Sequence, residues 1–301
     1  MTDRRYRQPM PFGGEDGLPF SKGLMARALI AAGLSADRAY ELALAVEADI
    51  AASGRPATTL ERLEEVALET LGHEDGTIAM RRLRRYRELQ QLDLPIILLI
   101  GGATGTGKST VATEVAHRLG ITRVTSTDFV RQTMRAFFSR EFMPSIHFSS
   151  FEAADAVADS ETGDPALLGF LEQTQNVLVG AKAAIDRALE EGWSMVLEGV
   201  HLVPGMLPPV GDQALVVQCV LSIESEDLHQ SHFVIRDITS EGVRSGDKYL
   251  AHLDEIRRIQ RYIVERARRA GVPVIENANA ELAVATVMEL VLAAADSLAH
   301  A

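Results

Sequence analysis

The chain has 301 residues, enough for one large domain or two, and its 47% hydrophobic and 24% charged residues are typical of a globular protein. A formal net charge of −12 counts against a nucleic-acid partner, because nucleic-acid binders carry a basic face that neutralises phosphates. The single cysteine excludes an internal disulfide, no apolar stretch approaches the ~18 residues that cross a membrane, and we expect a cytoplasmic protein.

The front of the chain predicts a small all-helical domain. Residues 1–17 mix Arg, Pro and Gly without periodicity, which favours an irregular leader. Over residues 18–75 apolar residues recur at helical spacing, with breaks at Gly33 and at residues 54–56. Residues 76–93 are rich in arginine and predict a linker helix with a solvated basic face.

The next segment contains the strongest motif. Five consecutive apolar residues, Ile96 to Ile100, suit a strand that is buried on both faces of a parallel sheet. They lead into Gly102-x-x-x-x-Gly107-Lys108-Ser109, which matches every fixed position of the phosphate-binding P-loop. Glycines leave the backbone N–H groups uncovered, so that the loop can surround a polyphosphate at the start of a helix. The alternative is a glycine-rich turn with a chance Lys-Ser pair.

This motif predicts ATP and Mg²⁺ as cofactors. Lys108 is expected to reach the β and γ phosphates, and Ser109 is expected to ligate Mg²⁺. The nucleotide-binding residues are then Gly102, Ala103, Thr104, Gly105, Thr106, Gly107, Lys108, Ser109 and Thr110.

After the P-loop, strand and helix patterns alternate. Further strands are predicted at Arg123–Ser126, Trp193–Leu197, Ala214–Leu221 and Val272–Ile275, with helices at Phe129–Phe138 and Ala166–Glu191. Strands joined by helical crossovers run parallel, so we predict an α/β fold: a P-loop NTPase three-layer fold with a five-stranded parallel sheet over residues 94–301, preceded by the small all-helical domain.

Two carboxylates follow predicted strands at the edge that holds the P-loop. Asp128 comes after the second strand and Glu198 after the third. A carboxylate at this edge can order Mg²⁺ and its waters or accept the proton of an acceptor hydroxyl. Both are therefore candidate catalytic residues, and Asp128 is also a candidate metal ligand. The alternatives are a helix N-cap for Asp128 and local capping of amides for Glu198.

Basic and hydrogen-bonding side chains near this edge are candidates for binding the acceptor. Arg131 and Arg135 are four residues apart on one helix, where paired guanidiniums can hold an acidic group, or they form a solvated face. We also expect Arg131 to take part in catalysis. Loop side chains could bind carboxylate or phosphate oxygens, or be ordinary loop residues: His147, Ser149, Ser150 and His201.

A basic segment with glycines near residues 232–248 occupies the place of a lid in nucleotide-kinase-type folds. A closing lid excludes water and neutralises charge on the transferring phosphoryl group. Arg236 and Arg244 are candidates for that catalytic role, and Lys248 is a candidate for binding the substrate. The alternative is an exposed basic helix-turn-helix.

The residues at the front of the chain resemble an ATP-cone, a helical regulatory domain of several nucleotide-linked enzymes. The resemblance covers roughly Gln8 to Gly72 and includes Pro19-Phe20-Ser21-Lys22. It implies that Lys22 and Arg27 contact nucleotide phosphates. A helical bundle that only packs on the following domain is the alternative.

The chain as a whole resembles the 2-phosphoglycerate kinase family. The resemblance is carried by Pro19 to Gly23, Ile100 to Thr110, Thr127-Asp128 with Arg131 and Met134-Arg135, Pro144 with His147, Ser149 and Ser150, Glu198 to Gly205, Lys248-Tyr249-Leu250, Ile256-Arg257, Tyr262-Ile263, and Val272 to Asn277. The departures lie mainly in the lid, where Asp237 to Gly242 replace a more arginine-rich sequence.

This resemblance implies an ATP-dependent kinase that phosphorylates a small anionic hydroxy acid, with 2-phosphoglycerate and its product 2,3-bisphosphoglycerate as the leading assignment. The net charge and the lack of a long apolar stretch predict no membrane partner and make a nucleic-acid partner unlikely, and a homo-oligomer stays open. Two alternatives remain: a nucleotide-sensing regulator that binds ATP without phosphotransfer, and a P-loop kinase for another small-molecule or RNA-linked hydroxyl.

Overall fold

The computed structural model describes residues 20–54, 58–92, 94–156, 163–239 and 246–299, without the side chains of 236–239 and 299. The chain divides into two compact units. One comprises residues 1–93, 118–120 and 288–301, and the other residues 94–117 and 121–287. Within the described ranges, no helix has the length and apolar character that a membrane span requires.

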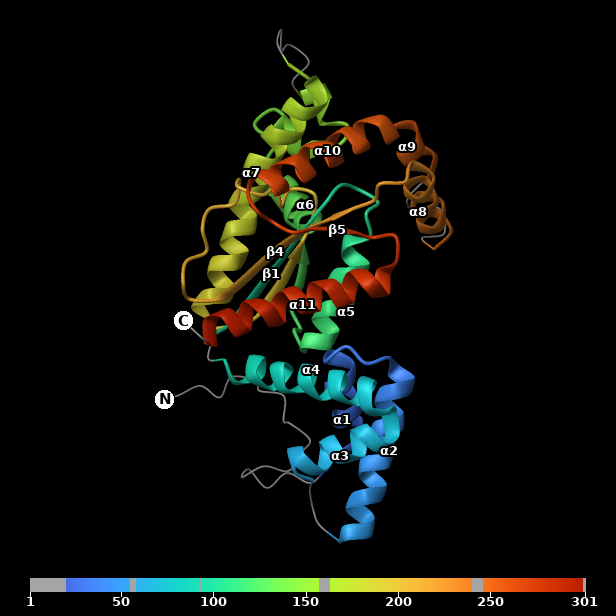
Figure 1. The fold of residues 1–301 in the computed structure, drawn as a ribbon. Helices are drawn as coiled ribbons and strands as arrows, with labels where there is room; N and C mark the ends of the chain where they lie inside the picture. The colour runs from blue at the N-terminus through green and yellow to red at the C-terminus, as the bar shows by residue number, and fades with distance from the viewer. Residues whose placement is uncertain (1–19, 55–57, 93, 157–162, 240–245, 300–301) are drawn as a thin grey trace. The chain divides into compact units, whose positions relative to one another are not determined.

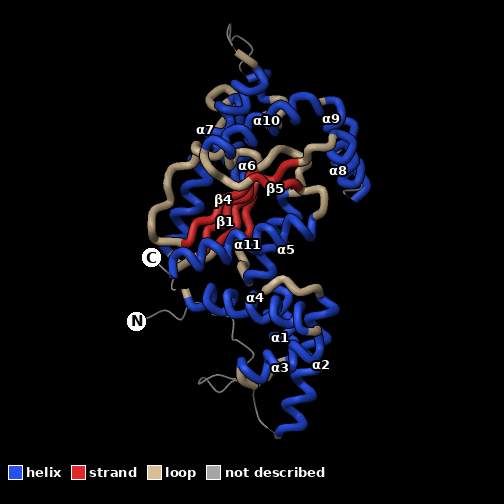
Figure 2. Tube along the Cα trace, in the orientation of Figure 1, coloured by secondary structure: helices blue, strands red, loops and turns tan. Residues whose placement is uncertain are grey.

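The second unit is built on a parallel sheet, as predicted (Figures 1 and 2). Its strands have the order β2-β3-β1-β4-β5, and every pairing is parallel. The bounds are β1 Ile96–Gly101, β2 Val124–Ser126, β3 Met195–Glu198, β4 Leu215–Ser222 and β5 Val274–Glu276. All of β1 is buried, as expected for the central strand of a sheet that is covered on both faces.

Helices cover both faces of this sheet (Figure 1). Their bounds are α5 Lys108–Leu119, α6 Thr127–Phe137, α7 Pro165–Glu190, α8 Glu226–Thr239, α9 Gly246–Ala251, α10 Leu253–Arg269 and α11 Ala280–Ala299, with short 3₁₀ helices η1 Pro144–His147 and η2 Ala153–Ala156.

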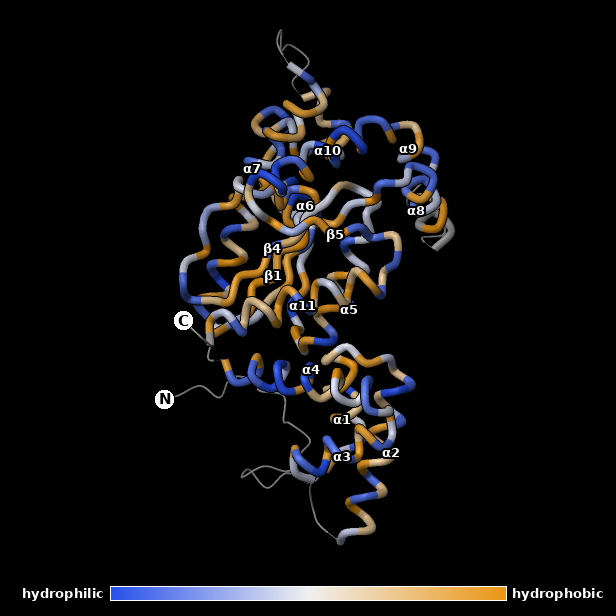
Figure 3. Tube along the Cα trace, viewed as in Figure 1, coloured by the Kyte–Doolittle hydropathy of each residue, from blue (hydrophilic) through white to orange (hydrophobic). Residues whose placement is uncertain are grey.

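Alternate residues of β1 serve the two faces. Ile97 and Leu99 pack with Ile185 of α7 in one apolar cluster. Because successive side chains of a strand point to opposite faces, Leu98 and Ile100 face the side that carries α5 and the first half of α11. The strands of the sheet form the hydrophobic centre of this unit in Figure 3.

Among the described residues, the first unit contains four whole helices and the second half of α11. The whole helices are α1 Lys22–Ala31, α2 Ala36–Ser53, α3 Leu60–Leu71 and α4 His73–Gln91. Within it the α4 arginines do not form a simply solvated face, because Arg84 pairs with Glu64 and Arg85 pairs with Glu289 and Asp296.

Lys22, a predicted phosphate contact, forms an ion pair of 3.0 Å with Glu47. Nucleotide binding by this unit therefore stays a prediction.

Helix α6 begins earlier than the sequence predicted. Its first residue is Thr127, and the N-cap is Ser126, whose Oγ accepts a hydrogen bond from the N–H of Phe129 at 3.0 Å. The alternative reading of Asp128 as the N-cap was wrong, because Asp128 lies inside the first helical turn. A carboxylate in that turn is favoured by the helix dipole.

Candidate functional site

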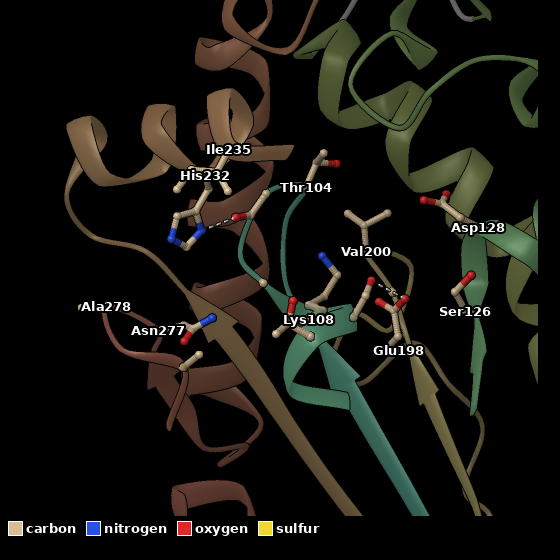
Figure 4. Close-up of a pocket in the computed structure, with 16 residues that line it drawn as sticks. Thr104, Lys108, Ser126, Asp128, Glu198, Val200, His232, Ile235, Asn277 and Ala278 are labelled. Atoms are coloured by element: carbon tan, nitrogen blue, oxygen red, sulfur yellow. Dashed lines mark hydrogen bonds between the residues drawn. The ribbon is translucent and has the colours of Figure 1, made fainter. Parts of the chain in front are cut away.

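A cavity of about 510 Å³ lies at the carboxyl edge of the sheet. Figure 4 shows side chains from the P-loop, the ends of β2 and β3, helix α8 and the segment after β5 converging on it. In a parallel α/β sheet this edge collects the loops that follow each strand, so ligands bind there. The lining includes Thr104, Gly105, Gly107, Lys108, Ser109, Thr110, Asp128, Glu198, His232 and Asn277.

The P-loop has the conformation that its glycines predict. Gly107 has a φ of +78°, and a Cβ there would lie 2.3 Å from Nδ2 of Asn277. The same Nδ2 donates to the carbonyl of Thr106 at 2.9 Å, so Asn277 stabilises the conformation of the loop. Sequence reasoning did not assign Asn277 to the site, although its place directly after the last strand was a usable signal.

Lys108 is buried at the floor of the cavity. It is 8% exposed, and its Nζ donates to the carbonyl of Ala103 at 2.6 Å. Burial lowers the pKa of the Lys108 ammonium, and the charges of Glu198 and Asp128 oppose that shift. An anion bound here would find a desolvated cation beside open backbone N–H groups.

The two strand-end carboxylates have different surroundings. Glu198 is 7% exposed and accepts a hydrogen bond from Oγ of Ser109 at 2.9 Å. The Asp128 side chain is 67% exposed and lies 3.5 Å from Nε of Arg131. The structure therefore pairs Ser109 with Glu198, whereas Asp128 stands at the open side of the cavity.

These oxygens fit a bound Mg²⁺. The ion prefers hard oxygen ligands and usually takes one or two carboxylates, leaving its other positions to phosphates and water. Ser109 and Glu198 supply a hydroxyl and a carboxylate in contact, and Asp128 lines the same cavity. The described residues hold no group of three or more His, Cys, Asp or Glu side chains suited to a metal ion. A site of this kind would rely on phosphate oxygens as further ligands.

The two arginines of α6 do not act as a pair. Arg131 is 8% exposed, and its Nη1 donates to the carbonyls of Ile146 at 3.0 Å and Phe148 at 2.8 Å. Arg135 is exposed and bonds to Gln132. The expectation of one shared arginine face is corrected, because tertiary contacts turn Arg131 into the protein interior.

The remaining candidates for binding the acceptor do not line this cavity. His147 contacts the carbonyl of Phe138, and Lys248 pairs with Glu152 at 2.8 Å. Burial raises the pKa of the Glu152 carboxyl, but hydrogen bonds from Lys248 and Ser149 lower it, and the net shift is downward. Ser150 is 7% exposed, and His201 is fully buried. Their proposed contacts with a substrate stay predictions.

Helix α8 contacts the P-loop through two histidines. His232 begins the predicted lid, whereas His229 was not assigned to the site by sequence reasoning. His229 donates from Nε2 to the carbonyl of Thr104 at 2.8 Å, and His232 donates from Nδ1 to the carbonyl of Gly105 at 3.0 Å. Their spacing of three residues on one helix was the available signal.

Two lid candidates cannot be placed against these contacts. The side chain of Arg236 and the whole of Arg244 lie outside the described residues.

Comparison with known proteins gives a consistent set of relatives. The chain is 39% identical to a 2-phosphoglycerate kinase of Thermococcus kodakarensis over 271 residues, which cover 90% of this chain and 92% of that protein. It is 37% identical to the 2-phosphoglycerate kinase of Pyrococcus furiosus, covering 92% and 90% of the two chains. It is 40% identical to that of Methanothermobacter thermautotrophicus, covering 86% and 85%.

No protein-family model matches the chain. A solved shikimate kinase from Bacteroides thetaiotaomicron aligns with 65% of this chain and 95% of its own, at a TM-score of 0.30 and 13% identity, a likeness too slight to bear on function.

Proposed function

The chain belongs to the 2-phosphoglycerate kinase family, and we propose that it transfers the γ-phosphoryl group of ATP to the free hydroxyl of 2-phosphoglycerate, giving 2,3-bisphosphoglycerate. The observation that carries the proposal is the 39% identity over 90% of this chain and 92% of a relative bearing that name. A match of this extent includes the strand ends and the loops between them, where substrates bind, as well as the P-loop.

The nucleotide side of the cavity fits ATP with Mg²⁺. Bound there, Mg·ATP would supply the phosphoryl group and a metal ion that neutralises its charge. The backbone N–H groups from Gly102 to Thr110 would hold the phosphates, with the Lys108 ammonium beside them. Ser109 and Glu198, already in contact, would hold the metal ion.

Asp128 is the residue that we assign to the acceptor hydroxyl. Its side chain is far more exposed than that of Glu198 and opens on the same cavity. We assign it to orient the acceptor hydroxyl and to accept its proton, a role that a carboxylate within hydrogen-bond reach can fill. The net charge of −12 means that the anionic acceptor must be held by local cations, for which Arg131, Arg135 and Lys248 remain candidates.

The test is a panel of phosphorylated hydroxy acids incubated with the purified protein, ATP and Mg²⁺. We expect ADP and 2,3-bisphosphoglycerate in equal amounts with 2-phosphoglycerate, and little product with 3-phosphoglycerate. Turnover confined to another acid would contradict the substrate assignment. Tight ATP binding without transfer to any acceptor would instead favour a nucleotide-sensing regulator.

A further inference from the structure

The residues next to the two carboxylates in sequence, Thr127 and Gly199, are in close contact with each other. Thr127 precedes Asp128, and Gly199 follows Glu198. A Cβ at Gly199 would lie 1.8 Å from Oγ1 of Thr127, so only glycine lets the chain at the end of β3 pack this closely against the Thr127 side chain. The residue after β3 therefore packs against the first residue of α6, and Gly199 itself lines the cavity.

The hydroxyl of Thr127 is also bonded to a buried histidine. Oγ1 of Thr127 lies 2.8 Å from Nδ1 of His201, and Nε2 of His201 lies 2.9 Å from Oε1 of Gln173. All three residues are fully buried. None of them lines the cavity.

The hydrogen-bond partners fix the direction of each bond. Nε2 of Gln173 donates to the carbonyls of Ser145 at 2.6 Å and Phe148 at 3.1 Å, which leaves its Oε1 as an acceptor. His201 must then carry its proton on Nε2, because only that nitrogen faces Oε1. In the neutral ring Nδ1 is an acceptor, so the Thr127 hydroxyl donates to it.

The chain of contacts returns to its starting point. The carbonyl of Phe148, which accepts from Gln173, also accepts from Nη1 of Arg131 at 2.8 Å. Nε of Arg131 lies 3.5 Å from Oδ1 of Asp128. Asp128 follows Thr127 in the chain, so the contacts form a closed ring that begins and ends at one turn of α6. The ring is buried at Thr127, His201 and Gln173 and exposed at Asp128.

We propose that this ring positions Asp128 relative to Glu198 for phosphoryl transfer, with Thr127, His201 and Gln173 as positioning residues that never touch substrate. The inference rests on the proposed function, because it concerns the geometry of the same reaction. A carboxylate must sit within hydrogen-bond reach of the hydroxyl it serves, and a displacement of about 1 Å can cost on the order of 100-fold in rate. The Asp128 side chain is exposed and makes one ion pair of 3.5 Å, so the ring supplies the restraint that its own contacts do not.

The test compares Thr127→Val with Thr127→Ser. Valine removes the hydroxyl with little change in shape and leaves Nδ1 of His201 without a donor, whereas serine keeps the hydroxyl. We expect kcat to fall by about tenfold or more in Thr127→Val, with the KM for ATP within about threefold of wild type, and Thr127→Ser to recover most of the loss. The matched control is Thr174→Val, which removes an equally buried hydroxyl bonded only to its own helix at the carbonyl of Phe170. That control should keep wild-type kcat.

A double-mutant cycle separates positioning from general damage. If Thr127 acts through Asp128, then Thr127→Val should lower kcat by less than about twofold in an Asp128→Asn background, because the group being positioned is gone. Multiplicative losses in the double variant, or wild-type kcat in Thr127→Val, would overturn the inference. Should Thr127→Val not fold, His201→Gln breaks the same bond from the other side and enters the same cycle.

The readout is turnover of ATP with whichever acceptor the wild type phosphorylates, or with water if it phosphorylates none. Failure on 2-phosphoglycerate alone would then contradict the proposed substrate and leave the cycle able to decide the positioning role. A wild type that turns over no ATP at all would overturn both proposals.

Discussion

In the reaction proposed for this cavity, Lys108 serves the phosphates of ATP and Asp128 serves the acceptor. Lys108 is buried among the backbone groups of the P-loop, where any phosphate must lie before and during transfer. Asp128 is exposed, and its ion pair is with Arg131 of the same helix. The two residues should therefore affect different steps.

We expect Lys108→Ala to weaken ATP binding by about tenfold or more and to lower turnover as well. The substitution removes a charge-assisted contact to phosphate in both the ATP-bound ground state and the transition state. Asp128→Asn should leave the Kd for ATP within a few-fold of wild type and lower kcat by on the order of 100-fold. Titration calorimetry measures the Kd for ATP of both variants, and steady-state kinetics measures their kcat. Loss of ATP binding in Asp128→Asn with unchanged residual kcat would contradict this role and indicate that Asp128 helps to hold the Mg²⁺ ion bound to ATP.

His201 predicts a pH dependence of stability. Burial lowers the pKa of its imidazole from 6.5 to about 4, with Asp128 opposing the shift and the cations Arg131 and Lys108 adding to it. Between these two values the unfolded chain binds more protons than the folded one, so stability is lost as the pH falls through this window.

The loss from this one residue is at most about 1.4 kcal/mol per pH unit. Burial lowers the pKa of His229 to about 4 as well, so that histidine adds to the same slope. Urea unfolding followed by the fluorescence of Trp193, the single tryptophan, measures the slope in the sheet-containing unit. His201→Asn should make it shallower, and an unchanged slope would contradict the buried neutral histidine.

At the scale of elements, the turn from β2 into α6 connects the fold to the site. Ser126 ends the strand and caps the helix, and the next two residues are Thr127 of the ring and Asp128 of the cavity. Capping hydrogen bonds fix where the first helical turn begins, and with it the direction of both side chains. Helix α3 offers a matched cap in the other unit, where Thr59 accepts from the N–H of Arg62 at 3.2 Å.

Ser126→Ala and Thr59→Ala should each lower the free energy of unfolding of their own unit by about 1 kcal/mol, because each leaves a helix N-terminus uncapped. Only Ser126→Ala should also lower kcat, by several-fold, since only that cap orients Asp128. Circular dichroism melts and steady-state rates compare the two variants. Equal effects on kcat would show that the cap matters through stability alone.

At the scale of the whole molecule, the strands and the P-loop could be predicted because their signals are local. A run of apolar residues such as Ile96 to Ile100 specifies a buried strand by itself, and the glycines of the loop specify its conformation. The helix start near Asp128 was missed by two residues, because Ser126 and Asp128 are both good caps and only the path of the chain decides between them.

The surroundings of the residues proposed to bind the acceptor could not be predicted from local sequence signals. Arg131 and His201 are polar residues that sequence patterns place at a surface, yet both are buried, with partners such as Phe148 and Gln173 that lie far along the chain. Such burial depends on tertiary hydrogen bonds, here from Nη1 of Arg131 and both ring nitrogens of His201, which no local pattern encodes. The ring below the carboxylates was invisible for the same reason.

The measurement that tests the central claim most directly is ³¹P NMR of the protein with ATP, Mg²⁺ and 2-phosphoglycerate. The account predicts that the γ-phosphate signal of ATP falls in step with the growth of a second phosphate ester signal on the same acid, and that Lys108→Ala slows both. Release of the γ-phosphate only as inorganic phosphate, or an unchanged spectrum with the wild-type protein, would contradict it.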